Sequence, residues 1–199
     1  MRDQPLSTSA AIGTALALVG LWTTGLLGEG LTVEVARAVD LGALPAWLWR
    51  ATCLGAGVAV VLASRPAVRR LDPNARAGAA ALLLQLGGVG LVLLASVPEG
   101  ARPGEASGSW ETVALLCLGA LVPAAGFLLA ARWRREPVMR TETVVGFVAS
   151  TVALWAMLLA SGQGDWTGLA QRVALTAALG WMAWLFTRSL DPDARSVRG

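Results

Sequence analysis

Runs of about 20 apolar residues constrain this chain more than any other feature. Six such runs follow one another along the 199 residues, separated by short charged segments. Each run is apolar all round, and about 20 residues of helix cross the roughly 30 Å of hydrocarbon in a bilayer. We therefore predict an all-α, polytopic membrane protein, a six-transmembrane-helix bundle that forms a single integral membrane domain over residues 1–199. The expected spans are residues 9–28, 46–64, 77–97, 112–131, 143–160 and 168–187.

The composition agrees with membrane residence. Hydrophobic residues make up 55% of the chain, against about 45–50% in soluble domains. A soluble helical bundle is the alternative, but it needs amphipathic stripes that these runs lack. The first run leads into Glu29 without a convincing cleavage site, so we interpret it as a retained span and not as a signal peptide.

The arginines predict the orientation. All 16 basic residues are arginine, and four of them lie in the segment Ser64–Arg76. If the loops after the second and fourth spans and both termini share one side, that side holds 12 arginines and 6 acids, and the other holds 4 arginines and 7 acids. Cytoplasmic loops carry the excess of basic residues. We therefore expect cytoplasmic N and C termini in a multi-pass protein of the bacterial plasma membrane.

Polar and small residues inside the spans predict helix contacts. Gln85 falls in mid-membrane beside Gly87, Gly88 and Gly90, so its amide is expected to bond a neighbouring helix that the glycines allow to come close. A substrate contact is the other interpretation of this amide. Cys53 and Cys117 lie at similar depths, which permits a disulfide if their helices touch, although two small buried apolar side chains are the favoured interpretation.

Two prolines predict local geometry. Asp72 followed by a proline is typical of a helix start, because the carboxylate caps free N–H groups and proline fits the first helical position. Pro123 lies near the centre of the fourth span and removes one backbone hydrogen bond there. We expect a bend at this position.

Catalytic motifs are missing from the sequence. There is no histidine, the commonest metal ligand and general base, and no phosphate-binding loop or nucleophile elbow. We therefore predict no catalytic residues, no metal site and no cofactor, and we favour a protein that is not an enzyme. No charged residue falls in the middle of a span, which argues against a proton-driven transporter or channel. A nucleic-acid partner is not expected, because the positive charge lies in short loops between spans.

Acidic and aromatic residues gather on the predicted outer face. The candidate outer-face binding residues are Asp40, Glu99, Glu111 and Arg172, which lie near several interfacial tryptophans. Acids and indoles at this depth suit a cation, a lipid headgroup or part of a partner protein. Ordinary solvated loops with aromatic anchors are the alternative interpretation.

Several of these outer-face residues lie in short motifs. The motifs are Asp40-Leu41-Gly42 with Pro45-Ala46-Trp47-Leu48, Pro98-Glu99, Gly108 to Ala114, and Gly168-Leu169-Ala170-Gln171-Arg172 leading to Trp181. In them the chain resembles the bacterial domain-of-unknown-function family 998 over roughly residues 10–190. The resemblance implies a six-span integral membrane protein, common in actinobacteria, with no established activity.

The resemblance also bears on the site. Members of the family often carry a histidine entering the fourth span and an acid before the arginine entering the sixth, where this chain has Glu111 and Gln171. The resemblance therefore supports Asp40, Glu99 and Arg172 as candidates. We expect an accessory or binding component of the bacterial cell membrane, with membrane lipids and another membrane protein as partners. The alternative is a small transporter or lipid-handling enzyme that uses the outer acidic site.

Overall fold

The structure is a computed structural model that describes residues 4–26, 46–72, 75–96, 106–161 and 166–191. These parts of the chain are helical and hold no strand. The elements are α1 (Gln4–Leu26), α3 (Ala46–Leu71), α4 (Ala75–Ala95), α5 (Ala106–Leu116), a π-helical segment (Cys117–Leu121), α6 (Val122–Trp133), a short 3-10 helix (Pro137–Met139), α7 (Arg140–Ala160) and α8 (Thr167–Leu190).

The all-α, six-span fold predicted from the sequence is confirmed. Six helical stretches are long and apolar enough to cross a membrane, because α5, the π-helical segment and α6 form one continuous span. Valine, leucine, phenylalanine and tryptophan side chains remain exposed along the outside of the bundle. Such a surface suits hydrocarbon, where exposed apolar side chains carry no cost.

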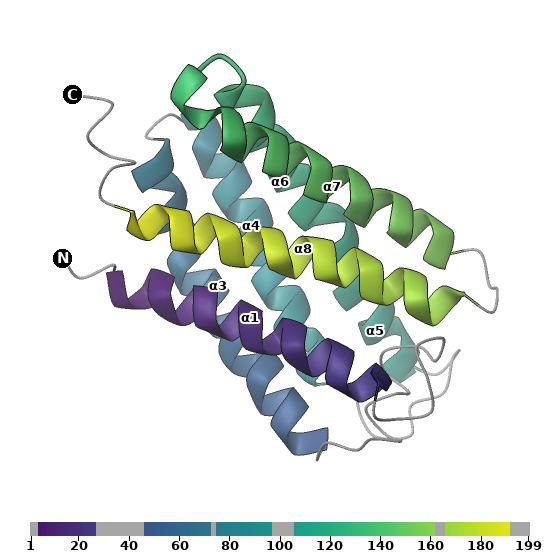
Figure 1. Ribbon diagram of the computed structural model, residues 1–199. Helices are drawn as coiled ribbons and strands as arrows, with labels where there is room; N and C mark the ends of the chain where they lie inside the picture. The colour runs from purple at the N-terminus through teal and green to yellow at the C-terminus, as the bar shows by residue number, and fades with distance from the viewer. Residues whose placement is uncertain (1–3, 27–45, 73–74, 97–105, 162–165, 192–199) are drawn as a thin grey trace.

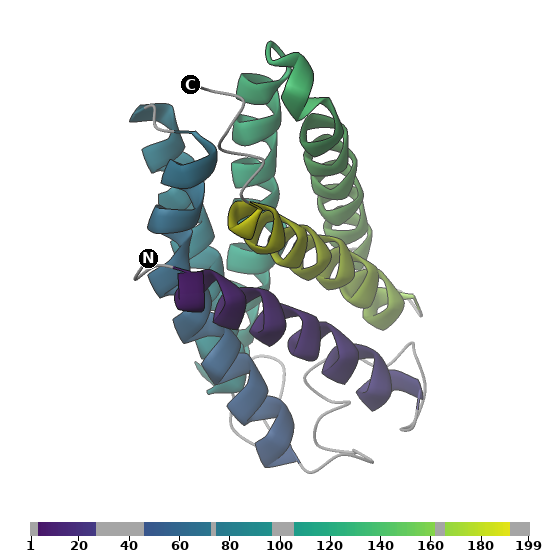
Figure 2. The ribbon, with the colours of Figure 1, turned by 60° about the vertical axis from the view of Figure 1, so that its left-hand side comes forward.

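The helices form a closed ring in chain order. Each span packs against the next one along the chain, and α8 closes the ring by packing against both α7 and α1 (Figure 1, Figure 2). Additional contacts join α8 to α3 and to the π-helical segment. Met182, Leu185 and Phe186 of α8 are buried in the core. The start of α1 and the end of α8 lie at the same end of the bundle (Figure 1).

Glycines allow two pairs of helices to approach closely. A Cβ atom added to Gly57 of α3 would lie 2.6 Å from the carbonyl oxygen of Gly88 in α4, and one added to Gly126 of α6 would lie 2.0 Å from Ser150 Oγ in α7. Real Cβ atoms do not come this near. Small residues therefore set the spacing of these helices, as expected for membrane interfaces.

The second span is longer than predicted. Its expected end was Ser64, but α3 continues through Pro66 to Leu71. The reason is that Ala67, Val68 and Leu71 are buried in the core, so the last two turns pack inward while Arg65 and Arg69 stay exposed. This burial offsets the hydrogen bond that proline removes. Most of the arginine-rich segment is therefore helix and not loop.

A π-helical segment directly precedes Val122 and Pro123, where the sequence predicted a bend. Cys117–Leu121 precedes the proline, and the Val122 N–H donates to the Cys117 carbonyl five residues back. Pro123 then lies in the first turn of α6 and donates no backbone hydrogen bond to the preceding turn. The backbone thus changes its hydrogen-bond pattern where proline interrupts the helix.

Cys53 and Cys117 are both free thiols. Cys53 is buried and Cys117 is half-buried. They act as small apolar side chains within the bundle, which was the favoured interpretation.

Candidate functional site

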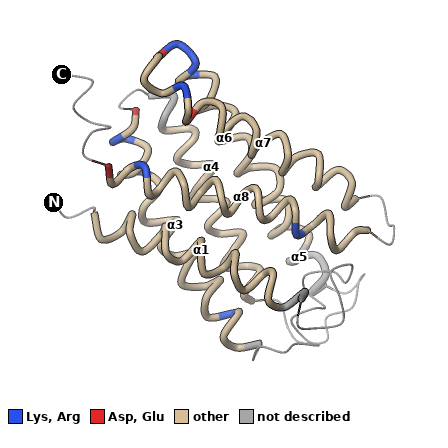
Figure 3. Tube along the Cα trace, viewed as in Figure 1, with Lys and Arg blue, Asp and Glu red and all other residues tan. Residues whose placement is uncertain are grey.

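Charged residues gather at the two ends of the bundle. The middle of the described helices carries none, and most of the charge lies at the end that holds both termini (Figure 3). We call this end, formed by the ends of α3, α6 and α8 and the starts of α4 and α7, the arginine-rich end. At the opposite end, α3 carries Arg50 near its start and α8 carries Arg172 in its second turn.

Of the four predicted outer-face residues, the structure describes the side chain of Arg172. Asp40 and Glu99 lie outside the described residues. Glu111 belongs to α5, but its side chain is not described either. The grouping of these acids with Arg172 therefore stays a prediction, and Arg172 is the member whose surroundings are given.

Arg172 is fully buried, with 0% of its surface exposed. It belongs to α8, which packs against both α1 and α7. Its Nη1 atom donates a hydrogen bond to the Gly168 carbonyl at 3.3 Å, and this is not its only interaction. Burying a guanidinium in a membrane span is costly, so such residues are rare and commonly functional.

A hydrogen-bond chain ties α1 to α8 next to Arg172. The Trp22 indole Nε1–H donates to Thr176 Oγ1 at 2.9 Å, and the Thr176 hydroxyl donates to the Arg172 carbonyl at 2.6 Å. Trp22 and Thr176 are 154 residues apart in the chain. The contact fixes the first span against the last one at Thr176, one turn after Arg172 along α8.

Gln85 has the interhelical partner expected of it. Its Nε2 atom donates to the Val61 carbonyl of α3 at 3.1 Å. This bond lies beside the close approach of Gly57 and Gly88, which joins the same two helices. The described contact is therefore one that holds α3 and α4 together.

An ion pair that the sequence did not predict joins α3 to α6 at the arginine-rich end. Asp72 directly follows α3 and is almost fully buried, and its Oδ2 atom lies 3.3 Å from Arg132 Nε. Arg132 also reaches Glu136 Oε1 at 3.5 Å. Pro73 and Asn74 lie outside the described residues, so the predicted capping of the third span by Asp72 stays a prediction.

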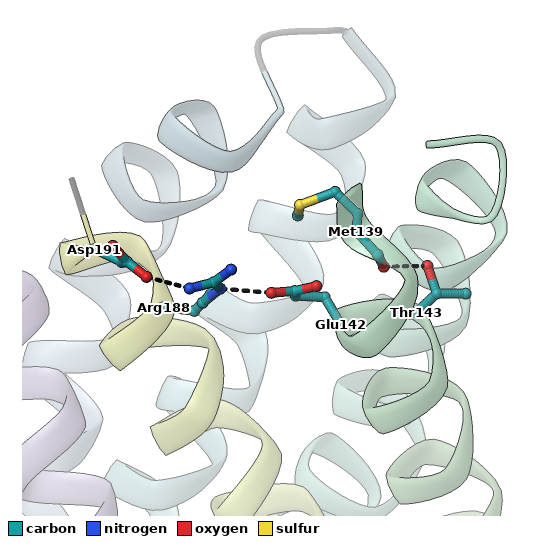
Figure 4. Close-up of polar contacts among 5 residues, drawn as sticks. All are labelled: Met139, Glu142, Thr143, Arg188 and Asp191. Carbon is teal, nitrogen blue, oxygen red and sulfur yellow. Dashed lines mark hydrogen bonds and ion pairs between the residues drawn. The ribbon is translucent and has the colours of Figure 1, made fainter. Parts of the chain in front are cut away.

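A second network joins α7 to α8 at the same end (Figure 4). Glu142, in the first turn of α7, is 4% exposed and accepts a hydrogen bond from Arg188 Nε through Oε1. Arg188 lies between Glu142 and Asp191 and donates to both (Figure 4). The other oxygen of Glu142, Oε2, is buried and accepts no hydrogen bond from the described residues.

Sequence reasoning missed Glu142 because the fifth span was predicted to begin at residue 143. The helix begins at Arg140, which places Glu142 inside the first turn of the span. An acid inside a span demands a partner. A predicted start three residues earlier would have placed Glu142 inside the span and indicated that it needs a partner. Nothing in the sequence indicates that this partner is Arg188.

The described residues provide ion pairs and interhelical hydrogen bonds, and no catalytic grouping is evident among them. Within this part of the chain, no group of three histidine, cysteine, aspartate or glutamate residues is placed to hold a metal ion. Asp72 and Glu142 are each held by an arginine from a neighbouring helix. Their geometry suits holding the ring closed at this end.

The closed ring of membrane-crossing helices, with charge confined to its ends, defines a polytopic α-helical membrane protein. Residues 11–188 match the family described as "Protein of unknown function (DUF998)", and the chain belongs to this family. No curated protein and no solved structure matches the chain. The family suspected from the outer-face motifs is thus confirmed.

Proposed function

We propose that this protein is an accessory, ligand-binding component of the bacterial plasma membrane, with both termini in the cytoplasm. The observation that carries the proposal is the placement of charge. In the described helices, arginines and acids lie at the two ends, while the middle of the ring is filled by apolar side chains such as Leu118, Met182 and Phe186. Pumps and proton-coupled transporters need ionisable groups along the path through the membrane, and the middle of the described helices carries none, so this arrangement favours binding over transport.

Arg172 is the centre of the proposed binding site. It is a fixed positive charge held between helices at the end of the bundle opposite the termini. A guanidinium presents planar donors that match carboxylate and phosphate groups. We propose that Arg172 binds the anionic group of a lipid, or of another membrane protein, here. Asp40, Glu99 and Glu111 would repel an anion, so we assign them to a cationic group of the same ligand.

Native mass spectrometry tests the proposal. The full chain is purified in mild detergent, and the molecules that remain bound are compared with those of an Arg172→Gln variant. We expect the wild-type chain to keep an anionic molecule that the variant loses. Arg50→Gln is the matched control, because Arg50 lies at the same end of the bundle but is half-exposed. Equal retention by all three proteins contradicts a site at Arg172.

A second candidate function is a small transporter or lipid-handling enzyme with an outer-face acidic site. One observation favours it, the burial of Arg172. A charge buried this deeply is also typical of substrate sites in transporters. Reconstituted proteoliposomes separate the two functions. Protein-dependent flux or lipid turnover that Arg172→Gln abolishes overturns the accessory function and supports this second one.

A further inference from the structure

The described acids at the arginine-rich end form ion pairs with two arginines. In the described part of the chain, this end holds the four acids Asp72, Glu136, Glu142 and Asp191. Asp72 and Glu136 pair with Arg132, whereas Glu142 and Asp191 pair with Arg188. Arg132 and Arg188 therefore each hold two of these acids.

Five exposed arginines at this end stand outside the ion pairs of the described residues. We call Arg65, Arg69, Arg134, Arg135 and Arg140 the arginine rim. None of the five forms an ion pair with an acid among the described residues. Their guanidinium groups are exposed, unlike the buried Arg172.

The Asp72–Arg132 ion pair brings the two halves of the rim together. It places the end of α3 against the end of α6. Arg69 lies three residues before Asp72, and Arg134 lies two residues after Arg132. Blue segments therefore lie near one another at this end of the bundle (Figure 3). The rim is a local concentration of positive charge contributed by α3, by the α6–α7 connection and by the start of α7.

Exposed apolar side chains lead along the helices to the rim. On α3, Val58, Leu62, Arg65 and Arg69 are all exposed and follow one another at intervals of three or four residues. On one face of a helix this spacing forms a continuous stripe. At one end of the stripe, Val58 and Leu62 can pack against acyl chains, and at the other end Arg65 and Arg69 can bind phosphate.

The same arrangement occurs on α7. Arg140 is followed by Val144, Phe147 and Val148, which are all more than half exposed. Arginine donates two parallel hydrogen bonds to a phosphate, and basic residues beside a membrane span are attracted to anionic lipids. A phospholipid with its headgroup at Arg140 and its acyl chain along α7 matches this stripe in both polarity and direction.

We propose that the arginine rim binds the headgroups of anionic phospholipids in the adjacent leaflet, with their acyl chains lying along the apolar stripes of α3 and α7. This inference does not depend on the proposed site at Arg172, which lies at the opposite end of the bundle. Either one can therefore fail without the other.

Competition between lipids tests the proposal. The full chain in detergent is mixed with phosphatidylglycerol or with phosphatidylcholine of the same acyl composition, and bound lipids are counted by native mass spectrometry. We expect phosphatidylglycerol to bind more tightly, and Arg69→Gln or Arg140→Gln to weaken it roughly fivefold each. Raising the salt concentration should reduce the preference further. Equal binding of the two lipids by the wild-type chain overturns the proposal.

Two variants separate lipid recognition from a general effect of charge or folding. Arg69→Lys keeps the charge but loses the planar pair of donors, so we expect it to bind phosphatidylglycerol with an affinity between those of the wild-type chain and Arg69→Gln. Arg50→Gln removes an arginine at the opposite end and should leave phosphatidylglycerol binding unchanged. A loss in Arg50→Gln as large as that in Arg69→Gln contradicts a site at the rim.

Discussion

Polar side chains inside this protein are held by partners on neighbouring helices. Gln85 reaches Val61 across the α3–α4 contact, and Trp22 reaches Thr176 across the α1–α8 contact. A polar atom in a membrane has no water to replace a lost partner, although measured bonds of this kind are modest, at about 0.6 kcal/mol. Such bonds therefore fix which helices meet more than they add to stability.

Gln85→Leu distinguishes the two interpretations of this amide. If Gln85 only joins α3 to α4, the variant should lose roughly 0.6 kcal/mol of stability and keep every molecule that copurifies with the protein. Thermal unfolding in detergent and native mass spectrometry measure the two effects. Loss of a bound molecule without a change in stability supports the substrate contact instead.

Glu142→Gln should destabilise the bundle more than Glu136→Gln. Glu142 is buried and bonded to Arg188, so replacing its charge weakens a charge-assisted hydrogen bond by about 1–2 kcal/mol. Glu136 is half-exposed and 3.5 Å from Arg132, a surface pair that contributes little. The midpoints of thermal unfolding in detergent should differ accordingly. Equal midpoints for the two variants count against the α7–α8 network.

At the level of single residues, the sequence predicts which groups need partners but not where those partners lie. The depth of Gln85 in its span predicts an interhelical hydrogen bond. The position of Arg172 at the start of the sixth span marks it as a candidate site residue. The pairing of Asp72 with Arg132 depends on the ends of α3 and α6 lying side by side. That proximity is a property of the folded ring, which no local pattern records.

Close approach of small residues determines the spacing of α3 and α4. Gly88→Ala should destabilise the protein, because the new Cβ would lie 2.8 Å from the Gly57 carbonyl oxygen and must push the helices apart. Overpacking of this kind costs roughly 1–3 kcal/mol. Gly78→Ala on the same helix is the matched control, since its Cβ would meet nothing within 4 Å.

The two alanine substitutions should change the stability of the protein in different directions. Alanine is favoured over glycine in a helix interior by roughly 0.5–1 kcal/mol, so Gly78→Ala should leave stability unchanged or raise it. Thermal unfolding of both variants in the same detergent measures the difference. If both raise the unfolding midpoint, α3 and α4 are not packed as closely as described.

The apolar runs predict the six helices, but their ends depend on packing. A span was expected to stop where arginines begin, yet α3 extends to Leu71 because one face of its last turns is buried. Pro123 predicts a bend, whereas the π-helical segment Cys117–Leu121 before it was not predicted. Composition thus determines the number and type of elements, and tertiary contacts determine their bounds.

The closure of the ring belongs to the whole molecule. Six spans place both termini on one side, which the sequence predicts from an even count. The contact of α1 with α8 brings together the first and last spans and buries Arg172 between helices. Periodicity and composition are local and give no sign of this contact, which explains why the surroundings of Arg172 could not be predicted.

Accessibility of single cysteines tests the orientation of the whole molecule. Val138 lies exposed at the arginine-rich end, and Trp166 lies exposed at the opposite end. In a Cys53→Ala, Cys117→Ala background, a membrane-impermeant maleimide should label Trp166→Cys in intact spheroplasts. It should label Val138→Cys only after the membrane is permeabilised, because arginines hold that end in the cytoplasm. Neither substitution removes an arginine, so the determinant of orientation stays intact. Labelling of Val138→Cys in intact spheroplasts, with Trp166→Cys protected, shows the reverse orientation and moves the arginine rim to the outer leaflet.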